Sequence, residues 1–251
     1  MRLGRSTPEA LDNQRIVHVN GHDYVLSEFV GAAPVRGMYV EGNEANGNEL
    51  PQGFLVEQPP GSVTPPHFHE TDQFQVFVGG SGQMGKRTAQ PVAVHYAGGH
   101  TPYGPIAAGD DGVQYFTLRR HWDPGAKYMP QSRDRLRRGP RRHRLSDSIS
   151  LTNGGRDRSG GTSVALRTIM PLEEDGLAAY LLRLGANEAA DAPDPAGGGG
   201  QYHVVVGGSM VDGDQTLPRL SCHFVTADEA AARVTAGPDG LDLLVLQFPR
   251  A

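Results

Sequence analysis

The chain carries an internal repeat, and this repeat limits the folds open to it more than any other feature. QFQVFVGGS at Gln73–Ser81 matches QYHVVVGGS at Gln201–Ser209 in six of nine residues, and AGDDG at Ala108–Gly112 matches AGPDG at Ala236–Gly240 in four of five. The two matches keep one register, because the second copy follows the first at the same separation in both. A chain of 251 residues is long enough for two compact units. The repeat therefore predicts a duplication, with two similar units in one chain.

Composition and short-range patterns indicate that both units are built from strands. The chain has 34 glycines and 19 prolines, which suit the many turns of an all-β protein better than long helices. In the first copy of the repeat, the side chains of Phe74–Val78 alternate, so that Gln75 and Phe77 share one face. We therefore predict an all-β fold, with this face toward the interior.

A group of imidazole and amide side chains in the N-terminal half is typical of a metal site. His67 and His69 are two residues apart, so on a strand both imidazoles point to one face. Gln73 keeps the same parity, and His100 arrives from later in the chain. Neutral imidazoles that converge from neighbouring strands are common ligands of divalent transition metals. The predicted metal ligands are His67, His69, Gln73 and His100.

The spacing of these residues resembles the cupin superfamily. Its first motif is a glycine, five residues, H-x-H, three or four residues, a glutamate, six residues and a glycine, and its second is P-x-G-x-x-H. The residues that keep the first spacing, with glutamine in place of glutamate, are Gly61, His67, His69, Gln73 and Gly80. His100 ends a segment with the second spacing, although the proline and the glycine of the motif are replaced.

The resemblance implies two double-stranded β-helix barrels, of the cupin or jelly-roll type, in one chain. We place a metal-binding barrel at residues 1–130, an arginine- and glycine-rich linker at 131–162, and a degenerate barrel without a metal site at 163–251. Only Gln201 of the ligand set recurs in the second half, because the other equivalent positions hold Pro195, Gly197 and Asp228. We therefore expect one metal ion per chain, in the first barrel.

The glutamine at position 73 changes the chemistry expected of the site. An amide in place of a carboxylate leaves the metal more electrophilic, which favours an anionic, chelating substrate. It also removes a carboxylate that could act as a general base. The candidates for catalytic proton transfer that lie nearest to His100 in the sequence are His95, Tyr96 and Tyr103.

The cupin superfamily includes enzymes of several classes as well as non-enzymatic binders, so the resemblance by itself names no reaction. Together with the charge of the site, it predicts a metal-dependent enzyme that acts on a small anionic organic molecule. Three-histidine sites resemble those of cupin dioxygenases, so a non-haem iron(II) dioxygenase is our leading hypothesis. Zinc, manganese, nickel or copper would also suit imidazole ligands. Zinc, manganese or nickel could support a lyase, isomerase or cyclase without redox chemistry. A third hypothesis is a cupin that binds a small molecule without turnover.

The remaining features concern partners and compartment. The formal net charge of −5 gives no argument for nucleic acid, and no segment reaches the ~18 apolar residues that cross a bilayer. We interpret seven arginines between Arg133 and Arg144 as a solvated connector. A single cysteine, Cys222, and an N-terminus without a signal-peptide core predict a cytoplasmic protein. The apolar face that includes Phe74 could pack barrels within one chain or between two, so a homodimer stays open.

Overall fold

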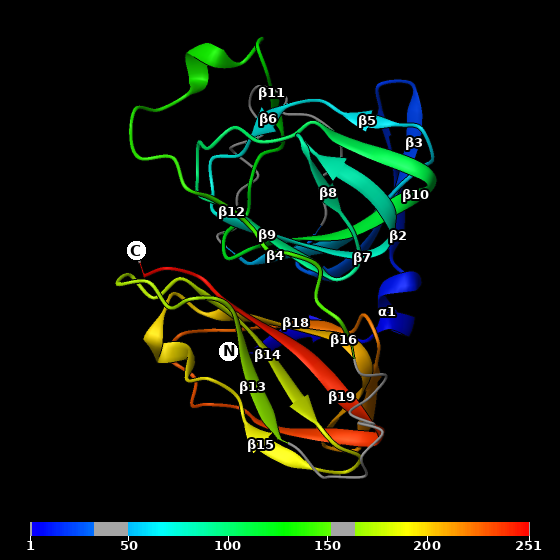
Figure 1. Ribbon diagram of the computed structural model, residues 1–251, viewed down its shortest axis with the longest axis vertical. Helices are drawn as coiled ribbons and strands as arrows, with labels where there is room; N and C mark the ends of the chain where they lie inside the picture. The colour runs from blue at the N-terminus through cyan, green and yellow to red at the C-terminus, as the bar shows by residue number, and fades with distance from the viewer. Residues whose placement is uncertain (1, 33–49, 152–163, 251) are drawn as a thin grey trace. The chain divides into compact units, whose positions relative to one another are not determined.

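The computed structural model describes residues 2–32, 50–151 and 164–250 (Figure 1). These residues form mostly strands, and the predicted all-β class is confirmed. They divide into two compact units, which we call the first unit (Leu11–Ile149) and the second unit (Met1–Ala10 with Ser150–Ala251). No helix in the described part of the chain is long and apolar enough to span a membrane.

The first unit is a curved antiparallel sheet whose strands wrap around one interior (Figure 1). Its strands are β2 (Gln14–Val19), β3 (His22–Val30), β4 (Gln52–Gln58), β5 (Val63–Thr64), β6 (His67–Phe68), β7 (Gln73–Met84), β8 (Arg87–Ala89), β9 (Ala93–Ala97), β10 (Ile106–Arg119), β11 (Lys127–Tyr128) and β12 (His143–Leu145). The order across the sheet is β12-β9-β7-β10-β4-β3-β2, with β5 on β10 and β8 on β7. β6 and β11 form a separate pair.

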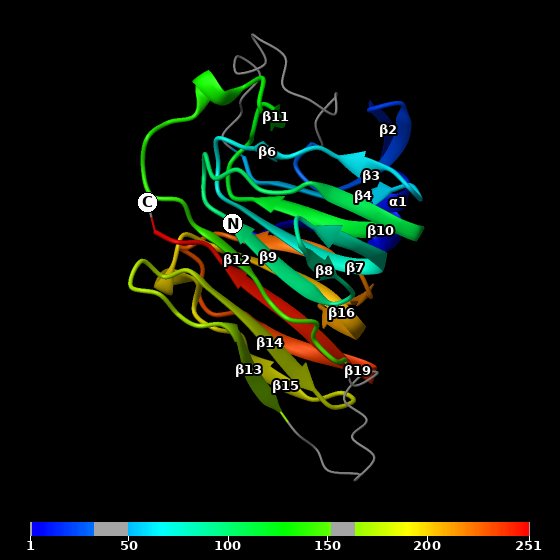
Figure 2. The ribbon, with the colours of Figure 1, turned by 45° about the horizontal axis from the view of Figure 1, so that its top comes forward.

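The second unit repeats this plan. Its elements are β1 (Arg2–Arg5), α1 (Thr7–Leu11), which ends at the boundary with the first unit, β13 (Ala165–Met170), β14 (Ala178–Leu184), β15 (Ala189–Asp191), β16 (Gln201–Asp212), β17 (Gln215–Pro218), β18 (Cys222–Val225) and β19 (Arg233–Gln247). The order across the sheet is β1-β18-β16-β19-β14-β13, with β15 on β19 and β17 on β16. Figure 2 shows β14 running beside β19 in this sheet.

The duplication predicted from sequence is present in the strand pairing. β7 and β16 begin and end at equivalent positions of the repeat, and each pairs with the long strand of its unit in the same register. Phe74 lies opposite Leu118 in the first unit, and Tyr202 lies opposite Leu246 in the second. Both pairs also shift register where the strands carry glycines. The repeat therefore preserves backbone geometry as well as sequence.

The unit boundaries differ from those predicted. β12 pairs with β9, and Ile149 N–H donates to Val92 O (2.6 Å), so the chain up to residue 149 belongs to the first unit. The arginine-rich segment is therefore not a free connector over 131–149, and the rest of the predicted linker lies almost wholly outside the described residues. β1 pairs with β18, which assigns the N-terminus to the second unit. Sequence periodicity missed both edge strands because each is short.

The strand parity predicted for β7 sets the interior of the first unit. Gln75 and Phe77 face inward, where Phe77 packs in a cluster that includes Tyr24, Phe54 and Tyr115. The alternate side chains face the other side of the sheet and are fully buried there. An alternating strand thus places polar Gln73 and Gln75 on the inner wall of the barrel.

Candidate functional site

Backbone pairing brings the H-x-H segment against the loop that follows β9. His67 N–H donates to Tyr103 O (3.1 Å), and Tyr103 N–H donates to His67 O (3.0 Å), so Tyr103 lies directly opposite His67. Gln73 begins β7, and Arg119 ends β10 in the strand beside it. These four side chains therefore meet inside the first unit.

Hydrogen bonds of fixed direction connect three of these side chains. His67 Nδ1 lies 2.7 Å from the Pro65 carbonyl oxygen, which only accepts, so Nδ1 carries the proton and Nε2 does not. Tyr103 Oη therefore donates to His67 Nε2 (2.8 Å). Gln73 Nε2 in turn donates to Tyr103 Oη. One hydroxyl thus satisfies a buried imidazole and a buried amide.

His69 is held in the same tautomer by a buried carboxylate. Its Nδ1 donates to Asp123 Oδ1 (2.6 Å). Asp123 also accepts from the backbone N–H groups of Glu70 (2.9 Å) and Gly125 (2.9 Å), which anchors the carboxylate. The Nε2 atom of His69 is therefore unprotonated, as Nε2 of His67 is.

A buried arginine completes the cluster. Arg119 is only 2% exposed, and both Nε (3.2 Å) and Nη2 (3.0 Å) donate to Gln73 Oε1. Nη1 donates to Oε1 of Gln52 (2.6 Å), its cross-strand neighbour on β4. Nη2 also lies 3.1 Å from Nε2 and 3.2 Å from Nδ1 of His69, so the guanidinium sits against that ring rather than in line with one nitrogen. These contacts fix the position of the positive charge.

The protonation states follow from burial and from these neighbours. Burial, with the nearby His69 and the Arg119 charge, lowers the pKa of His67 to about 3, and burial with Arg119 lowers the pKa of His69. Burial also raises the pKa of Tyr103 well above its usual range. For Asp123, burial alone would raise the pKa, but His69, Arg119 and the hydrogen bonds outweigh it and hold the pKa well below its usual range. At neutral pH the cluster thus contains neutral imidazoles and phenol, a cationic Arg119 and an anionic Asp123.

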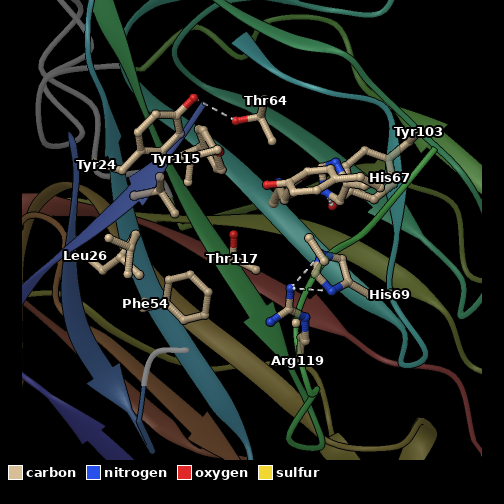
Figure 3. A pocket seen from close by; sticks show the side chains of 17 residues that line it. Tyr24, Leu26, Phe54, Thr64, His67, His69, Tyr103, Tyr115, Thr117 and Arg119 are labelled. Atoms are coloured by element: carbon tan, nitrogen blue, oxygen red, sulfur yellow. Dashed lines mark hydrogen bonds between the residues drawn. The ribbon is translucent and has the colours of Figure 1, made fainter. Parts of the chain in front are cut away.

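The cluster forms the polar part of a pocket in the barrel interior. The cavity has a volume of about 80 Å³, and His67, His69, Tyr103 and Arg119 lie along one side of it (Figure 3). The opposite side is apolar and aromatic, and its labelled residues are Tyr24, Leu26, Phe54 and Tyr115. Tyr24 Oη and Thr64 Oγ1 are 3.1 Å apart at the far end. The pocket therefore combines one buried cation with an aromatic wall.

This arrangement does not fit a divalent metal at the predicted ligands. Among the residues that the structure describes, no three His, Cys, Asp or Glu side chains are placed to hold one ion. A metal bound about 2 Å from His69 Nε2 would lie within about 5 Å of Arg119 Nη2. Two unit charges at ~5 Å repel by roughly 3 kcal/mol at an effective dielectric constant of about 20, and a divalent ion doubles this. Gln73 Oε1, moreover, already accepts two N–H groups of Arg119.

Comparison with known proteins gives the fold. No protein-family model matches the sequence, and no curated protein is significantly similar to it. Solved structures do match, among them a proposed dioxygenase from Nostoc punctiforme (TM-score 0.59, 11% identity, 100% of this chain and 79% of that chain). Pirin YhhW from Escherichia coli in complex with nickel(II) matches with a TM-score of 0.56 and 11% identity over 100% of both chains. The Mn(II)-containing oxalate decarboxylase of Bacillus subtilis matches with a TM-score of 0.54 and 11% identity, over 99% of this chain and 78% of that chain.

The chain has a cupin fold. The structure corrects the register in which the second cupin motif was placed on the sequence. The backbone N–H of His100 donates to His69 O (2.7 Å), but its side chain does not join those of His67 and His69. The His100 ring lies 5.6 Å from that of Phe68, which points to the opposite face of β6. His100 also has φ +57°, a conformation that favours glycine. If the P-x-G-x-x-H motif is shifted by three residues, its glycine falls on His100 and its histidine falls on Tyr103, the residue opposite His67.

The other two catalytic candidates on β9 point to opposite faces. His95 faces inward, with Nδ1 2.8 Å from Gln75 Oε1 and its ring 4.9 Å from that of Tyr103. Tyr96 faces the other side of the sheet and packs against Phe74 at 5.0 Å between ring centroids. Strand alternation thus removes Tyr96 from the cupin pocket, whereas His95 and Tyr103 remain beside it.

Sequence reasoning missed the two charged residues of the cupin site. Arg119 lies on the same face of β10 as Tyr115 and Thr117, which line the pocket. A charged residue among these inward-facing positions could have been recognised from the alternation of the strand. Asp123 lies in a loop beyond the strand, where no periodicity indicates which way its side chain points. Its distance from His69 in the sequence gives no hint of their contact.

At two equivalent positions, the second unit has two amide side chains, whereas the first unit has one amide and one guanidinium. In the register of the repeat, Gln201 and Gln247 are the equivalents of Gln73 and Arg119. Gln201 Nε2 donates to Gln247 Oε1 (2.9 Å), so the same two positions are in contact in both cupin units. The equivalents of the two H-x-H histidines, Pro195 and Gly197, carry no nitrogen ligands.

Proposed function

We propose that the first unit binds a small anionic organic molecule in the pocket beside Arg119. The observation that supports this most is the buried guanidinium, which lines a cavity whose opposite wall is aliphatic and aromatic. Charge-assisted hydrogen bonds to a guanidinium are strong, and in a buried site they favour a carboxylate or phenolate. The aromatic wall suits a planar ring.

Each side of the pocket has a separate task in this proposal. Arg119 attracts the anionic group, and its bonds to Gln73 and Gln52 hold it in one orientation. Phe54 packs under the guanidinium, with the Arg119 carbon 5.7 Å from the ring centroid, and continues into the apolar wall.

Calorimetric titration of the chelator-treated, full-length protein with benzoate tests this proposal. We expect benzoate to bind more tightly than benzamide, its neutral isostere, and Arg119→Gln to weaken benzoate binding roughly 10- to 100-fold. Arg120→Gln removes the same charge one residue later, where the side chain does not line the pocket, and should leave binding unchanged. Equal affinity for benzoate and benzamide in the wild-type protein would contradict the proposal.

A second candidate is a metal-dependent enzyme, with a non-haem iron(II) dioxygenase ahead of a non-redox lyase, isomerase or cyclase. His67 and His69 both donate from Nδ1 to an anchoring oxygen, which is the tautomer that metal-bound histidines adopt. Structures of this fold include a nickel(II) complex and an enzyme with Mn(II) centres. This candidate requires Arg119 to leave its present contacts. Oxygen consumption that depends on added iron(II) and is abolished by His67→Ala would favour it over simple binding.

A further inference from the structure

We infer that Arg119 takes the place of the metal ion in the first unit, and that its guanidinium excludes a divalent cation which His67, His69, Gln73 and Tyr103 would otherwise bind. This is the site of the proposed function, but the exclusion does not depend on the identity of the bound anion.

The two histidines of the first unit already have the tautomer that a metal ion requires. His67 Nε2 and His69 Nε2 are both unprotonated, because each ring donates from Nδ1 to an oxygen. His67 Nε2 and Tyr103 Oη are 2.8 Å apart, and Gln73 donates to the same hydroxyl. The donor atoms that a transition metal would need are thus brought together in the tautomers that it would need.

The positive charge of Arg119 stands where a metal ion would be attracted. The guanidinium contacts both Gln73 Oε1 and the His69 ring, at 3.0 Å and 3.1 Å from Nη2. A metal bound to His69 would lie beside this charge and compete with it for the amide oxygen. Because Gln52 holds the other end of the guanidinium at 2.6 Å, the arginine cannot leave without losing several bonds at once.

The second unit lacks both the imidazole pair and the arginine. Where the two histidines are replaced by Pro195 and Gly197, the position of Arg119 holds Gln247 instead. Gln247 pairs with Gln201 through neutral amides, so the same backbone positions require no cation. The arginine is therefore present in the unit that has the two histidines and absent from the unit that lacks them. This is the distribution expected if its charge replaces a metal ion beside those histidines.

Nickel binding by full-length, chelator-treated protein tests the inference. We expect wild-type protein and the Arg120→Gln control to bind nickel chloride only weakly in calorimetric titrations. Arg119→Gln and Arg119→Met should take up one ion per chain, with a dissociation constant lower by a factor on the order of 100 or more, because a charge within about 5 Å of the ion is removed. Adding His67→Ala to Arg119→Gln should abolish the gain, which separates this site from surface histidines.

The nickel titrations can also contradict the inference. If wild-type protein binds one nickel ion as tightly as Arg119→Gln, or if neither variant gains a site, the inference is wrong. If both variants unfold, recovery of the fold on adding nickel supports the inference, and failure to recover contradicts it. Benzoate binding by the wild-type protein is measured without metal, so the two experiments are independent. The proposed function can fail while this inference holds, and this inference can fail while the proposed function holds.

Discussion

The Tyr103 hydroxyl links side chains from two distant parts of the first unit. It donates to His67 Nε2 at 2.8 Å and accepts from Gln73 Nε2, and all three side chains are buried. In a low-dielectric interior, such a bond is worth more when made and costs more when broken. The hydroxyl therefore contributes to the stability of the barrel as well as to the wall of the pocket.

Tyr103→Phe should lower the free energy of unfolding of the first unit by about 2–4 kcal/mol. The substitution keeps the ring but leaves a buried imidazole acceptor and a buried amide donor without their partner. Urea denaturation followed by tyrosine fluorescence measures the change. Tyr180→Phe removes a hydroxyl from a half-exposed tyrosine and should change stability by less than about 0.5 kcal/mol. A loss in Tyr103→Phe no larger than in this control would show that the hydroxyl is not part of a buried network.

At the scale of elements, the bulged pair of β7 and β10 sets which residues face the pocket. Gly80 has φ +62°, and a Cβ built on it would lie 2.1 Å from Gly112 O. Its equivalent Gly208 has φ +65° and a corresponding distance of 2.0 Å to Gly240 O. Both units thus need a residue without a side chain at the same point, beyond which the strand register shifts.

Gly80→Ala should destabilise the first unit by at least about 3 kcal/mol, because it combines a left-handed backbone with a clash against backbone atoms. Gly21→Ala is the matched control. Gly21 also has a positive φ, +82°, but nothing lies within 4 Å of a Cβ there, so the cost should be only about 1 kcal/mol. Thermal unfolding of both variants measures the difference, and equal losses would show that the close approach at Gly80 is unimportant.

The sequence predicts the register of the repeated strands, but it does not predict which loop residues or cross-strand neighbours reach the pocket. The constant offset of the repeat predicts the pairing of β7 and β16 with their partners, because a duplicated strand keeps its register. The H-x-H spacing likewise predicts that His67 and His69 face inward. His100 is misplaced because it lies in a loop after β9, where no period fixes which residue faces the pocket. The parity of Arg119 on β10 indicates that it faces inward, but its contacts with Gln73 and Gln52 depend on sheet pairing, which no local motif records.

At the scale of the whole molecule, both units bury histidines that stay neutral. Burial, with neighbouring positive charge or imidazole, lowers the pKa of each of them below its ordinary value, and these residues are His67, His69, His95, His203 and His223. In the unfolded chain each of them takes up a proton below about pH 6.5. The unfolded state therefore binds more protons than the folded state in acid, and stability must fall as the pH decreases.

We expect the free energy of unfolding to fall between about pH 6.5 and 5 by roughly 1.4 kcal/mol per pH unit for each such histidine in the unit that unfolds. Urea midpoints measured from pH 7.5 to 5.5 give the slope. His203→Gln, which introduces the residue found at the equivalent position 75, should reduce the slope of the second unit. A stability that does not vary over this interval would contradict the assignment of neutral, buried imidazoles.

The Arg119 guanidinium is buried in the interior of the first unit, and the proposed anion binding and metal exclusion both depend on it. The most direct measurement is a crystal structure of the wild-type protein soaked in nickel chloride, with anomalous diffraction data. We predict the Arg119 guanidinium in contact with Gln73 and His69, and no anomalous peak between these residues. A nickel ion bound to His67 and His69, with Arg119 displaced from them, would contradict this role of the arginine.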